Sequence, residues 1–235
     1  EHFEMDFENP TGWHVLLGDN GAGKSTIVRS IALGLIGPTD VHALRLPLIT
    51  WIQKNKDFST ISLTIEREQF DGYIGKKRPL KRPFEAFVTI SKEKSNGFEI
   101  GKIEKTIKGG VNPHNYLWSG RGGWFSAAFG PFRRFTGGDK EWSKVYYSNP
   151  KAAAHLSVFG EDIALTESLD WFSLMKYQSY EQNTEAVNTL DALKKFINLG
   201  KLLPHNAQLF EVSSEGVFFK DGNGLNIEVT HLSDG

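Results

Sequence analysis

The sequence predicts an α/β fold, and three observations lead to this prediction. A glycine-rich stretch, GDNGAGKST at 18–26, lies between a short apolar run and a segment whose apolar residues have the helical period. Segments in which apolar and polar residues alternate come next, as expected for an antiparallel β region. Two further helical patterns then precede three short strand patterns. With 235 residues and 39% hydrophobic content, the chain is long enough for one sizeable core or for a core with a smaller lobe.

The glycine-rich stretch fulfils the template G-x-x-x-x-G-K-[ST] in a suitable context. WHVLL at 13–17 has the pattern of a short buried strand. STIVRSIALGLIG at 25–37 has helical spacing, and the Gly37-Pro38 pair is expected to end that helix. The context therefore disfavours the alternative of a glycine-rich turn that binds nothing. The template is matched by four residues, Gly18, Gly23, Lys24 and Ser25.

These residue types suit the binding of nucleotide phosphates. Glycines allow backbone N–H groups to turn inward around a phosphate, and a helix N-terminus adds a partial positive charge. We expect Lys24 to reach the β- and γ-phosphates as the catalytic residue, the Ser25 hydroxyl to be a ligand of Mg²⁺, and Thr26 to contact the α-phosphate. The predicted nucleotide contacts in this loop are Asn20, Gly21, Ala22, Gly23, Lys24, Ser25 and Thr26.

An antiparallel β region is predicted after the first helix, from alternating segments at 59–66, 84–93 and 97–105, with SNG at 95–97 as a hairpin turn. A basic run lies between the first two of these segments. It is either a nucleic-acid contact or a solvated loop, and charge runs are more often simply solvated. Its charged residues are Lys76, Lys77, Arg78, Lys81 and Arg82.

The second half of the chain predicts a helical segment followed by strands. WFSAAFGPFRRF at 124–135 has the pattern of a buried strand that ends in a turn, where Arg133 and Arg134 are either phosphate sensors or a surface pair. Helices are predicted at 165–177 and 184–200. Strands are predicted at 207–213, 216–221 and 225–230, joined by the turns SSEG and DGNG.

Composition narrows the choice of surroundings and partners. The net charge of −1 does not indicate a nucleic-acid or membrane partner for the chain as a whole. The absence of cysteine excludes disulfides and thiolate metal sites and suits a cytoplasmic protein. No apolar run approaches the roughly 20 residues that cross a bilayer, so no membrane association is expected. Glu1 and Gly235 both interrupt patterns, and we expect both ends to be cut from a longer protein.

LSDG at 232–235 matches L-S-x-G, the beginning of the signature motif of ABC-type ATPases. Together with the glycine-rich loop, this motif makes the chain resemble prokaryotic AAA-family ATPases of the RecF, SMC and OLD-like ABC class. The resemblance covers nearly the whole chain. The stretches that carry it are GDNGAGKST (18–26), FGPFRRF (129–135), LSVFGEDIALTESLDWF (156–172), SSEGVFFKDGNG (213–224) and LSDG (232–235).

The resemblance implies an ATP-driven switch. In this class one ATP is held between two protomers, so Ser233 and Gly235 would contact the γ-phosphate on the partner's loop. Members are similar to ATPases of DNA repair and anti-phage defence that work with a nuclease. The implied domain is a single P-loop NTPase head over 1–235, with a phosphate-binding core and antiparallel β subdomain (1–135), a small helical lobe (136–205) and a β-hairpin leading to the signature (206–235).

One expected element is missing from the sequence. ABC-type enzymes carry an apolar strand that ends in Asp-Glu, where the Asp holds Mg²⁺ and the Glu orients the attacking water, and no such run is present. We therefore expect this chain alone to bind nucleotide incompletely and not to hydrolyse it competently. The alternative function is a scaffold or sensor that uses ATP without hydrolysis. A transporter domain is disfavoured, because it would place the signature closer to the loop and carry a glutamine in 124–135.

Overall fold

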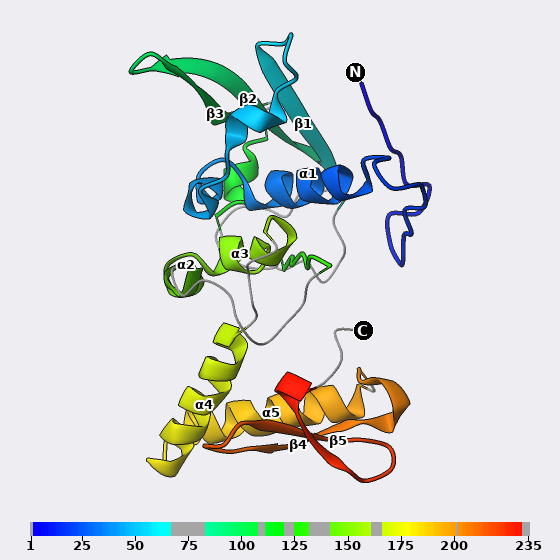
Figure 1. Ribbon diagram of the computed structural model, residues 1–235, viewed down its shortest axis with the longest axis vertical. Coiled ribbons are helices and arrows are strands. Elements are labelled where there is room, and N and C mark those ends of the chain that lie inside the picture. The colour runs from blue at the N-terminus through cyan, green and yellow to red at the C-terminus, as the bar shows by residue number, and fades with distance from the viewer. Residues whose placement is uncertain are drawn as a thin grey trace. The chain divides into compact units, whose positions relative to one another are not determined.

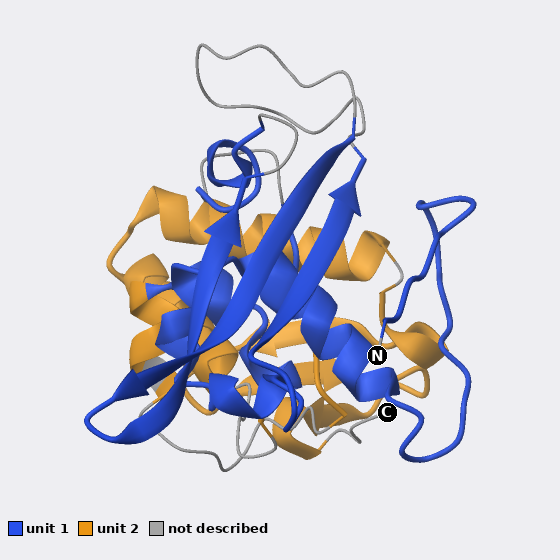
Figure 2. Ribbon diagram, turned by 90° about the horizontal axis from the view of Figure 1, so that it is seen from above, with its two compact units in different colours: residues 1–128, 149–159 blue, residues 129–148, 160–235 orange. Residues whose placement is uncertain are grey.

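The computed structural model describes residues 2–66, 83–107, 111–119, 125–131, 142–160, 166–200 and 202–231. The protein is a mixed α/β protein, and its strands form two separate three-stranded antiparallel sheets in the described part of the chain. The chain divides into two compact units, which Figure 2 shows in different colours. Unit 1 comprises Glu1–Ala128 and Asn149–Phe159, and unit 2 comprises Phe129–Ser148 and Gly160–Gly235.

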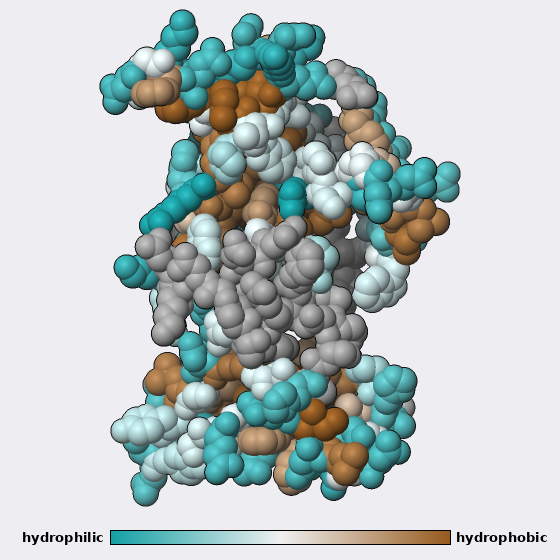
Figure 3. Space-filling view, in the orientation of Figure 1, coloured by the Kyte–Doolittle hydropathy of each residue, from teal (hydrophilic) through white to brown (hydrophobic). Residues whose placement is uncertain are grey.

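The sheet of unit 1 confirms the predicted antiparallel region. Its strands are β1 (Phe58–Ile65), β2 (Phe84–Ser95) and β3 (Phe98–Thr106), in the order β1-β2-β3. Alternate residues of β2 are buried on one face, while the other face carries mostly polar residues, and the top of Figure 3, where this sheet lies, is mostly hydrophilic. The predicted SNG turn joins β2 to β3, with Asn96 and Gly97 at φ values of 49° and 84°, as a two-residue hairpin turn requires.

Helix α1 (Lys24–Ile36) packs against the buried face of this sheet, as Figures 1 and 2 show from two directions. Leu33 and Ile36 are fully buried on the side of α1 that faces the core. Gly34 permits a close approach, because a Cβ atom there would lie only 2.7 Å from Cδ1 of Leu63 on β1. Two 3-10 turns follow α1 and continue the core of unit 1, η1 (Asp40–Leu44) and η2 (Leu48–Trp51).

The C-terminal end of α1 is closed by a tryptophan. In a continuing helix the Gly34 carbonyl would accept the N–H of residue 38, but Pro38 has no N–H to donate. The indole Nε1 of Trp118 donates to this carbonyl instead, at 2.9 Å. The same ring covers Gly37, where a Cβ atom would lie 2.5 Å from Cδ1 of the indole. Trp118 follows the turn η3 (Pro113–Asn115) and is 5% exposed.

The remaining part of unit 1 is a short helical segment. It contains α3 (Pro150–Ala153) and the turn η5 (Leu156–Val158), whose residues are buried. Asn149 holds α3 in two ways: its Oδ1 accepts the N–H of Ala152 at 3.0 Å, and its Nδ2 donates to Asp40 Oδ1 at 3.1 Å. The Asn149 side chain therefore caps α3 and joins it to the residues that follow α1.

Unit 2 contains the two helices and three strands predicted for the second half of the chain, and in addition the short helix α2, which was not predicted. Its helices are α2 (Ser143–Ser148), α4 (Thr166–Tyr180) and α5 (Thr184–Leu199), and its strands are β4 (Gln208–Val212), β5 (Val217–Lys220) and β6 (Asn226–Glu228). Two 3-10 turns complete the unit, η6 (Pro204–Asn206) and η7 (Val229–His231). The side chain of Asn183 caps α5, one residue before the expected Thr184.

The edge strand β4 is closed by side chains of α5. Asn198 binds both backbone polar groups of Leu209. Its Oδ1 accepts the Leu209 N–H at 2.8 Å, and its Nδ2 donates to the Leu209 carbonyl at 3.1 Å. Lys194 Nζ donates to the next carbonyl, that of Phe210, at 2.6 Å. Two polar side chains thus take the place of a neighbouring strand, which is one way of protecting the edge of a sheet.

Two predicted strands are wrong. Residues 13–17 form no strand, and Trp13 and Leu17 are 99% and 90% exposed. Residues 125–130 have no regular structure, and Phe125 is exposed. An apolar run becomes a strand only when a neighbouring strand pairs with its backbone, and neither sheet in the described part of the chain offers such a partner. Among the described residues, no helix is long and apolar enough to cross a membrane.

Candidate functional site

The predicted phosphate-binding loop lies directly before α1 and is turned back on itself. The N–H of Ala22 donates to the Asp19 carbonyl at 3.2 Å, which closes a turn inside the loop. Gly21 and Gly23 have φ values of 86° and 87°, in the left-handed region that other residues rarely adopt. A Cβ atom at either glycine would meet nothing within 4 Å, so the space in front of the loop is open there. The backbone conformation therefore explains why these two positions are glycine.

The side chain of Lys24 folds over this loop. Its Nζ donates to the carbonyls of Gly18 at 2.6 Å and of Asp19 at 2.8 Å. Both acceptors lie at the start of the loop, five and six residues before the lysine, so the ammonium group spans the opening of the turn. Both hydrogen bonds are exposed to solvent, so the ammonium group is accessible to an anion that binds at the loop.

The N-terminus of α1 has free hydrogen-bonding capacity. Gly23 is its N-cap and supplies no side-chain acceptor, and the first turn contains no acidic residue. The first N–H groups of a helix have no partners within the helix, and the helix dipole adds a partial positive charge at this end. The two effects together suit an anion with several oxygen atoms.

The hydroxyl groups of Ser25 and Thr26 lie at the same end of α1 and are exposed. Within the described ranges neither hydroxyl has a hydrogen-bond partner in the protein. Backbone N–H groups, an ammonium group and free hydroxyls are the donors that bind phosphate oxygens, and a serine hydroxyl is also a suitable ligand for Mg²⁺. The described residues contain no group of three or more His, Asp or Glu side chains that could hold a metal ion by themselves.

Contacts along α1 fix the position of the loop. Gly34 rests against Leu63 of the sheet, and its carbonyl accepts the Trp118 indole. Nearer the loop, Arg29 Nε donates to the Val158 carbonyl at 2.8 Å. Sequence reasoning missed Arg29 and Trp118, because their partners lie 129 and 84 residues away along the chain. No local pattern identifies such contacts, although the proline at position 38 leaves a carbonyl that needs a donor.

The other predicted site residues lie outside the described residues. These are the basic run, the arginine pair and the signature motif: Lys76, Lys77, Arg78, Lys81, Arg82, Arg133, Arg134, Ser233 and Gly235. The structure therefore brings together the loop contacts from Asn20 to Thr26 and does not bear on the rest of the predicted site.

Two ionisable side chains elsewhere in unit 1 have shifted pKa values, the partly buried Lys151 and the fully buried His155. Lys151 Nζ donates to the Leu117 carbonyl at 2.7 Å, and burial lowers the pKa of Lys151 to about 8, although the charge of Asp40 acts in the opposite direction. His155 is fully buried, and its Nδ1 lies 2.8 Å from the Lys151 carbonyl, which it can bind only as a donor. Burial also lowers the pKa of His155, which favours the neutral ring, and its buried Nε2 has no hydrogen-bond partner among the described residues.

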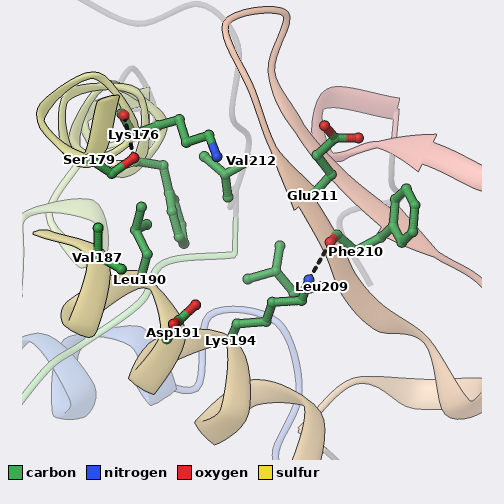
Figure 4. Close-up of a pocket in the computed structure, with 11 residues that line it drawn as sticks. Lys176, Ser179, Val187, Leu190, Asp191, Lys194, Leu209, Phe210, Glu211 and Val212 are labelled. Atoms are coloured by element: carbon green, nitrogen blue, oxygen red, sulfur yellow. Dashed lines mark hydrogen bonds between the residues drawn. The ribbon is translucent and has the colours of Figure 1, made fainter. Parts of the chain in front are cut away.

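A pocket of about 360 Å³ lies in unit 2 between α4, α5 and β4. Figure 4 shows apolar side chains such as Leu190, Leu209 and Val212 in its wall, with lysines and acidic residues around them. One of these lysines, Lys194, is bound to the Phe210 carbonyl. The charges of the two signs are equal in number among the lining residues, so the pocket has no preference for an anion or a cation. It contains none of the predicted site residues.

The strongest candidate site is accordingly the loop at 18–26 with the N-terminus of α1. It combines open space at Gly21 and Gly23 with an exposed lysine ammonium and with two exposed hydroxyls that have no hydrogen-bond partner among the described residues. Comparison of the chain with protein-family models, with curated proteins and with solved structures gave no match.

Proposed function

We propose that the loop at 18–26 binds the phosphates of ATP together with Mg²⁺, and that the chain is the ATP-binding head of an ABC-type ATPase. The observation that carries this proposal is the conformation of the loop. Gly21 and Gly23 adopt left-handed backbone angles directly before a helix whose first turn holds no acid, and Lys24 lies over the loop. The open space at both glycines and the exposed ammonium and hydroxyl groups beside them support the proposal.

Each residue of the loop has a role in this proposal. The backbone N–H groups of 20–26 bind the phosphate oxygens, and Lys24 exchanges its bonds to the Gly18 and Asp19 carbonyls for bonds to the β- and γ-phosphates. Ser25 is the protein ligand of the Mg²⁺ ion, and Thr26 binds the α-phosphate. The metal ion, when bound, neutralises charge between the phosphates.

The proposal extends to assembly. ATP would be held between two protomers, each of which contributes its loop and the Ser233–Gly235 signature of the other site. The dimer would switch an effector that acts on nucleic acid, in DNA repair or anti-phage defence. Support for this part comes from the sequence resemblance alone, so it needs tests separate from those of ATP binding.

The test of ATP binding compares Lys24→Ala with the unchanged chain by titration calorimetry with MgATP. Charge-assisted hydrogen bonds contribute about 1.5–3 kcal/mol each, so the loss of one such bond weakens binding by roughly 10- to 150-fold. Lys56→Ala is the matched control, because Lys56 is an exposed lysine of unit 1 in a loop before β1. Equal affinities of Lys24→Ala and the control would contradict the role given to Lys24. Absence of binding to the unchanged chain would contradict the proposed function.

Assembly and hydrolysis are tested on the same protein. Sedimentation with a non-hydrolysable ATP analogue should show a dimer that Lys24→Ala does not form. Binding without dimerisation would leave the phosphate site in place and reject the ATP sandwich. Release of inorganic phosphate would identify an ATPase. Its absence is expected of this chain, which lacks the Asp-Glu strand, and would leave the alternative of a scaffold or sensor that binds ATP without hydrolysing it standing.

The nucleic-acid part of the proposal is tested at the basic run. Reversing the charges of Lys76, Lys77 and Arg78 should weaken nucleic-acid binding and reduce its dependence on salt, because each neutralised phosphate releases counterions. Unchanged binding and an unchanged salt dependence would mean that this run is a solvated loop.

A further inference from the structure

The helix that begins at the candidate site also contacts a distant segment of unit 1. Arg29 lies five residues after Lys24 on α1, and its Nε donates to the Val158 carbonyl at 2.8 Å. The Arg29 side chain is half-buried, and Val158 is buried in the turn η5. Because an α-helix moves as a rigid rod over five residues, a shift of the loop end of α1 also moves Arg29.

Val158 lies where the chain passes from unit 1 to unit 2. The chain leaves unit 1 after Ala128, returns at Asn149 and leaves again after Phe159. The two exits are joined inside unit 1. The Ala128 N–H donates to the Ala154 carbonyl at 2.9 Å, and the Ser157 hydroxyl donates to the Ala128 carbonyl at 3.4 Å.

The two exits and their bonds form a small group of residues that we call the exit segment: Ala128 and 154–159. Its last residue, Phe159, also contacts the ring of Trp51 at 6.4 Å between ring centroids, so this end of the segment packs against unit 1. Among the hydrogen bonds of the described residues, the one from Arg29 connects α1 to this segment directly. A change at the loop that moves α1 therefore has a defined path to the points at which the chain leaves unit 1.

We propose that Arg29 is a positioning residue that transmits the nucleotide state of the loop to the exit segment. The inference rests on the proposed function, since it assumes that the loop binds nucleotide. When phosphates draw the first turn of α1 toward them, Arg29 moves with the helix and carries the Val158 carbonyl with it. The order of the exit segment then differs between the nucleotide-bound and nucleotide-free protein, and unit 2 receives the signal through the chain itself.

Hydrogen exchange measured with and without a non-hydrolysable MgATP analogue tests this transmission. In the unchanged protein, nucleotide should slow exchange in the first turns of α1 and at the amides of the exit segment, by on the order of threefold or more. Arg29→Met keeps an unbranched apolar stem but removes the donor. It should retain nucleotide affinity within about threefold and slowed exchange in α1, but lose the nucleotide-dependent change in the exit segment.

Two further variants complete the test. Arg29→Lys retains a charged donor and should restore part of the response, and Lys56→Met removes an exposed cation of unit 1 and should leave the response unchanged. A purely structural role for Arg29 would alter exchange in the exit segment equally with and without nucleotide, and that result would overturn the inference.

The outcomes separate this inference from the proposed function. Nucleotide binding with no exchange response in the exit segment of the unchanged protein rejects the transmission and leaves the phosphate site standing. An equal response in the unchanged protein and Arg29→Met rejects the role of Arg29. No nucleotide binding rejects both proposals. If Arg29→Met does not fold, Arg29→Lys decides: a response reduced in proportion to its weaker bond supports the transmission, and a full response contradicts it.

Discussion

Replacement of Trp118 by phenylalanine should destabilise unit 1, mainly because the Gly34 carbonyl loses its hydrogen-bond donor. The Gly34 carbonyl is buried at the end of α1, and Pro38 cannot supply the N–H that a continuing helix would provide. The Trp118 indole donates to it at 2.9 Å. Phenylalanine keeps an aromatic ring beside Gly37 but has no donor, so Trp118→Phe leaves the carbonyl without a partner in a site that water does not reach.

The size of this effect follows from two contributions. A buried polar group that loses its partner costs about 1–3 kcal/mol. The smaller ring also leaves unfilled space against Gly37, where the indole is in close contact, and this adds about 1 kcal/mol. We expect a loss of about 2–4 kcal/mol in the free energy of unfolding. A loss of 2 kcal/mol lowers the melting temperature by about 4–8 °C for a chain of this length.

Thermal and urea unfolding followed by far-ultraviolet circular dichroism measure this loss. Trp13→Phe is the matched control, since Trp13 is almost completely exposed and its replacement should change stability by less than about 0.5 kcal/mol. Hydrogen exchange at the last turn of α1 should quicken in Trp118→Phe and not in Trp13→Phe. A stability of Trp118→Phe within about 0.5 kcal/mol of that of Trp13→Phe would refute the reasoning, because the Gly34 carbonyl would then have another partner.

Two further predictions concern buried polar groups in each unit. Asn198→Ala should destabilise unit 2 by about 1–3 kcal/mol, because the N–H and the carbonyl of Leu209 both lose their hydrogen-bond partner. The control Asn188→Ala, on the exposed face of α5, should have little effect in the same denaturant titration. Equal losses of stability in the two variants would contradict the role of Asn198. The folded state holds the pKa of Lys151 at about 8, below the usual 10.5, so the unfolded chain binds more protons between these values. The stability of the protein relative to Lys151→Met should therefore rise from pH 8 to pH 10.5, and a difference that stays constant with pH would contradict burial of the amine.

The regular elements with a local signature were predictable from the sequence. The alternation at 59–66 and 84–93 reflects one buried and one solvated face, and a two-residue turn with glycine in second place fixes the hairpin. The helices α4 and α5 follow from spacing of apolar residues at 3.6 residues per turn. The start of α1 at Lys24 follows from the helical spacing of apolar residues at 25–37 and from the glycine-rich stretch directly before it.

The wrong predictions share a physical cause. The runs at 13–17 and 124–135 contain the residue types of buried strands, yet the described parts of both runs are not paired in a sheet. An apolar composition shows that burial of a segment is favourable, but it does not show which other segment pairs or packs with it. The exposed apolar side chains of the N-terminal segment are visible as brown atoms at the right of Figure 3.

The contacts that position the candidate site were not predictable in the same way. Trp118 and Arg29 each take part in a hydrogen bond to a backbone carbonyl far away along the chain. Their identity depends on which segments meet in space, and a single sequence carries no record of this. The Gly34 carbonyl is the exception. Pro38 shows from the sequence that this carbonyl lacks its helical donor, although the sequence does not identify Trp118 as the donor that replaces it.

Because the C-terminal end of α1 is fixed, a displacement of its N-terminal end becomes smaller along the helix. Gly34 packs closely against Leu63, and its carbonyl accepts the Trp118 indole, so the C-terminal end of the helix is fixed in position. The N-terminal end of the helix carries the open loop. At 1.5 Å per residue along the helix axis, Lys24 lies about 15 Å from Gly34, and Arg29 lies about 7.5 Å from it. A swing that moves the loop by about 1 Å therefore moves Arg29 by about 0.5 Å. The position of Arg29 along the helix sets how much of a displacement of the loop at 18–26 reaches the exit segment.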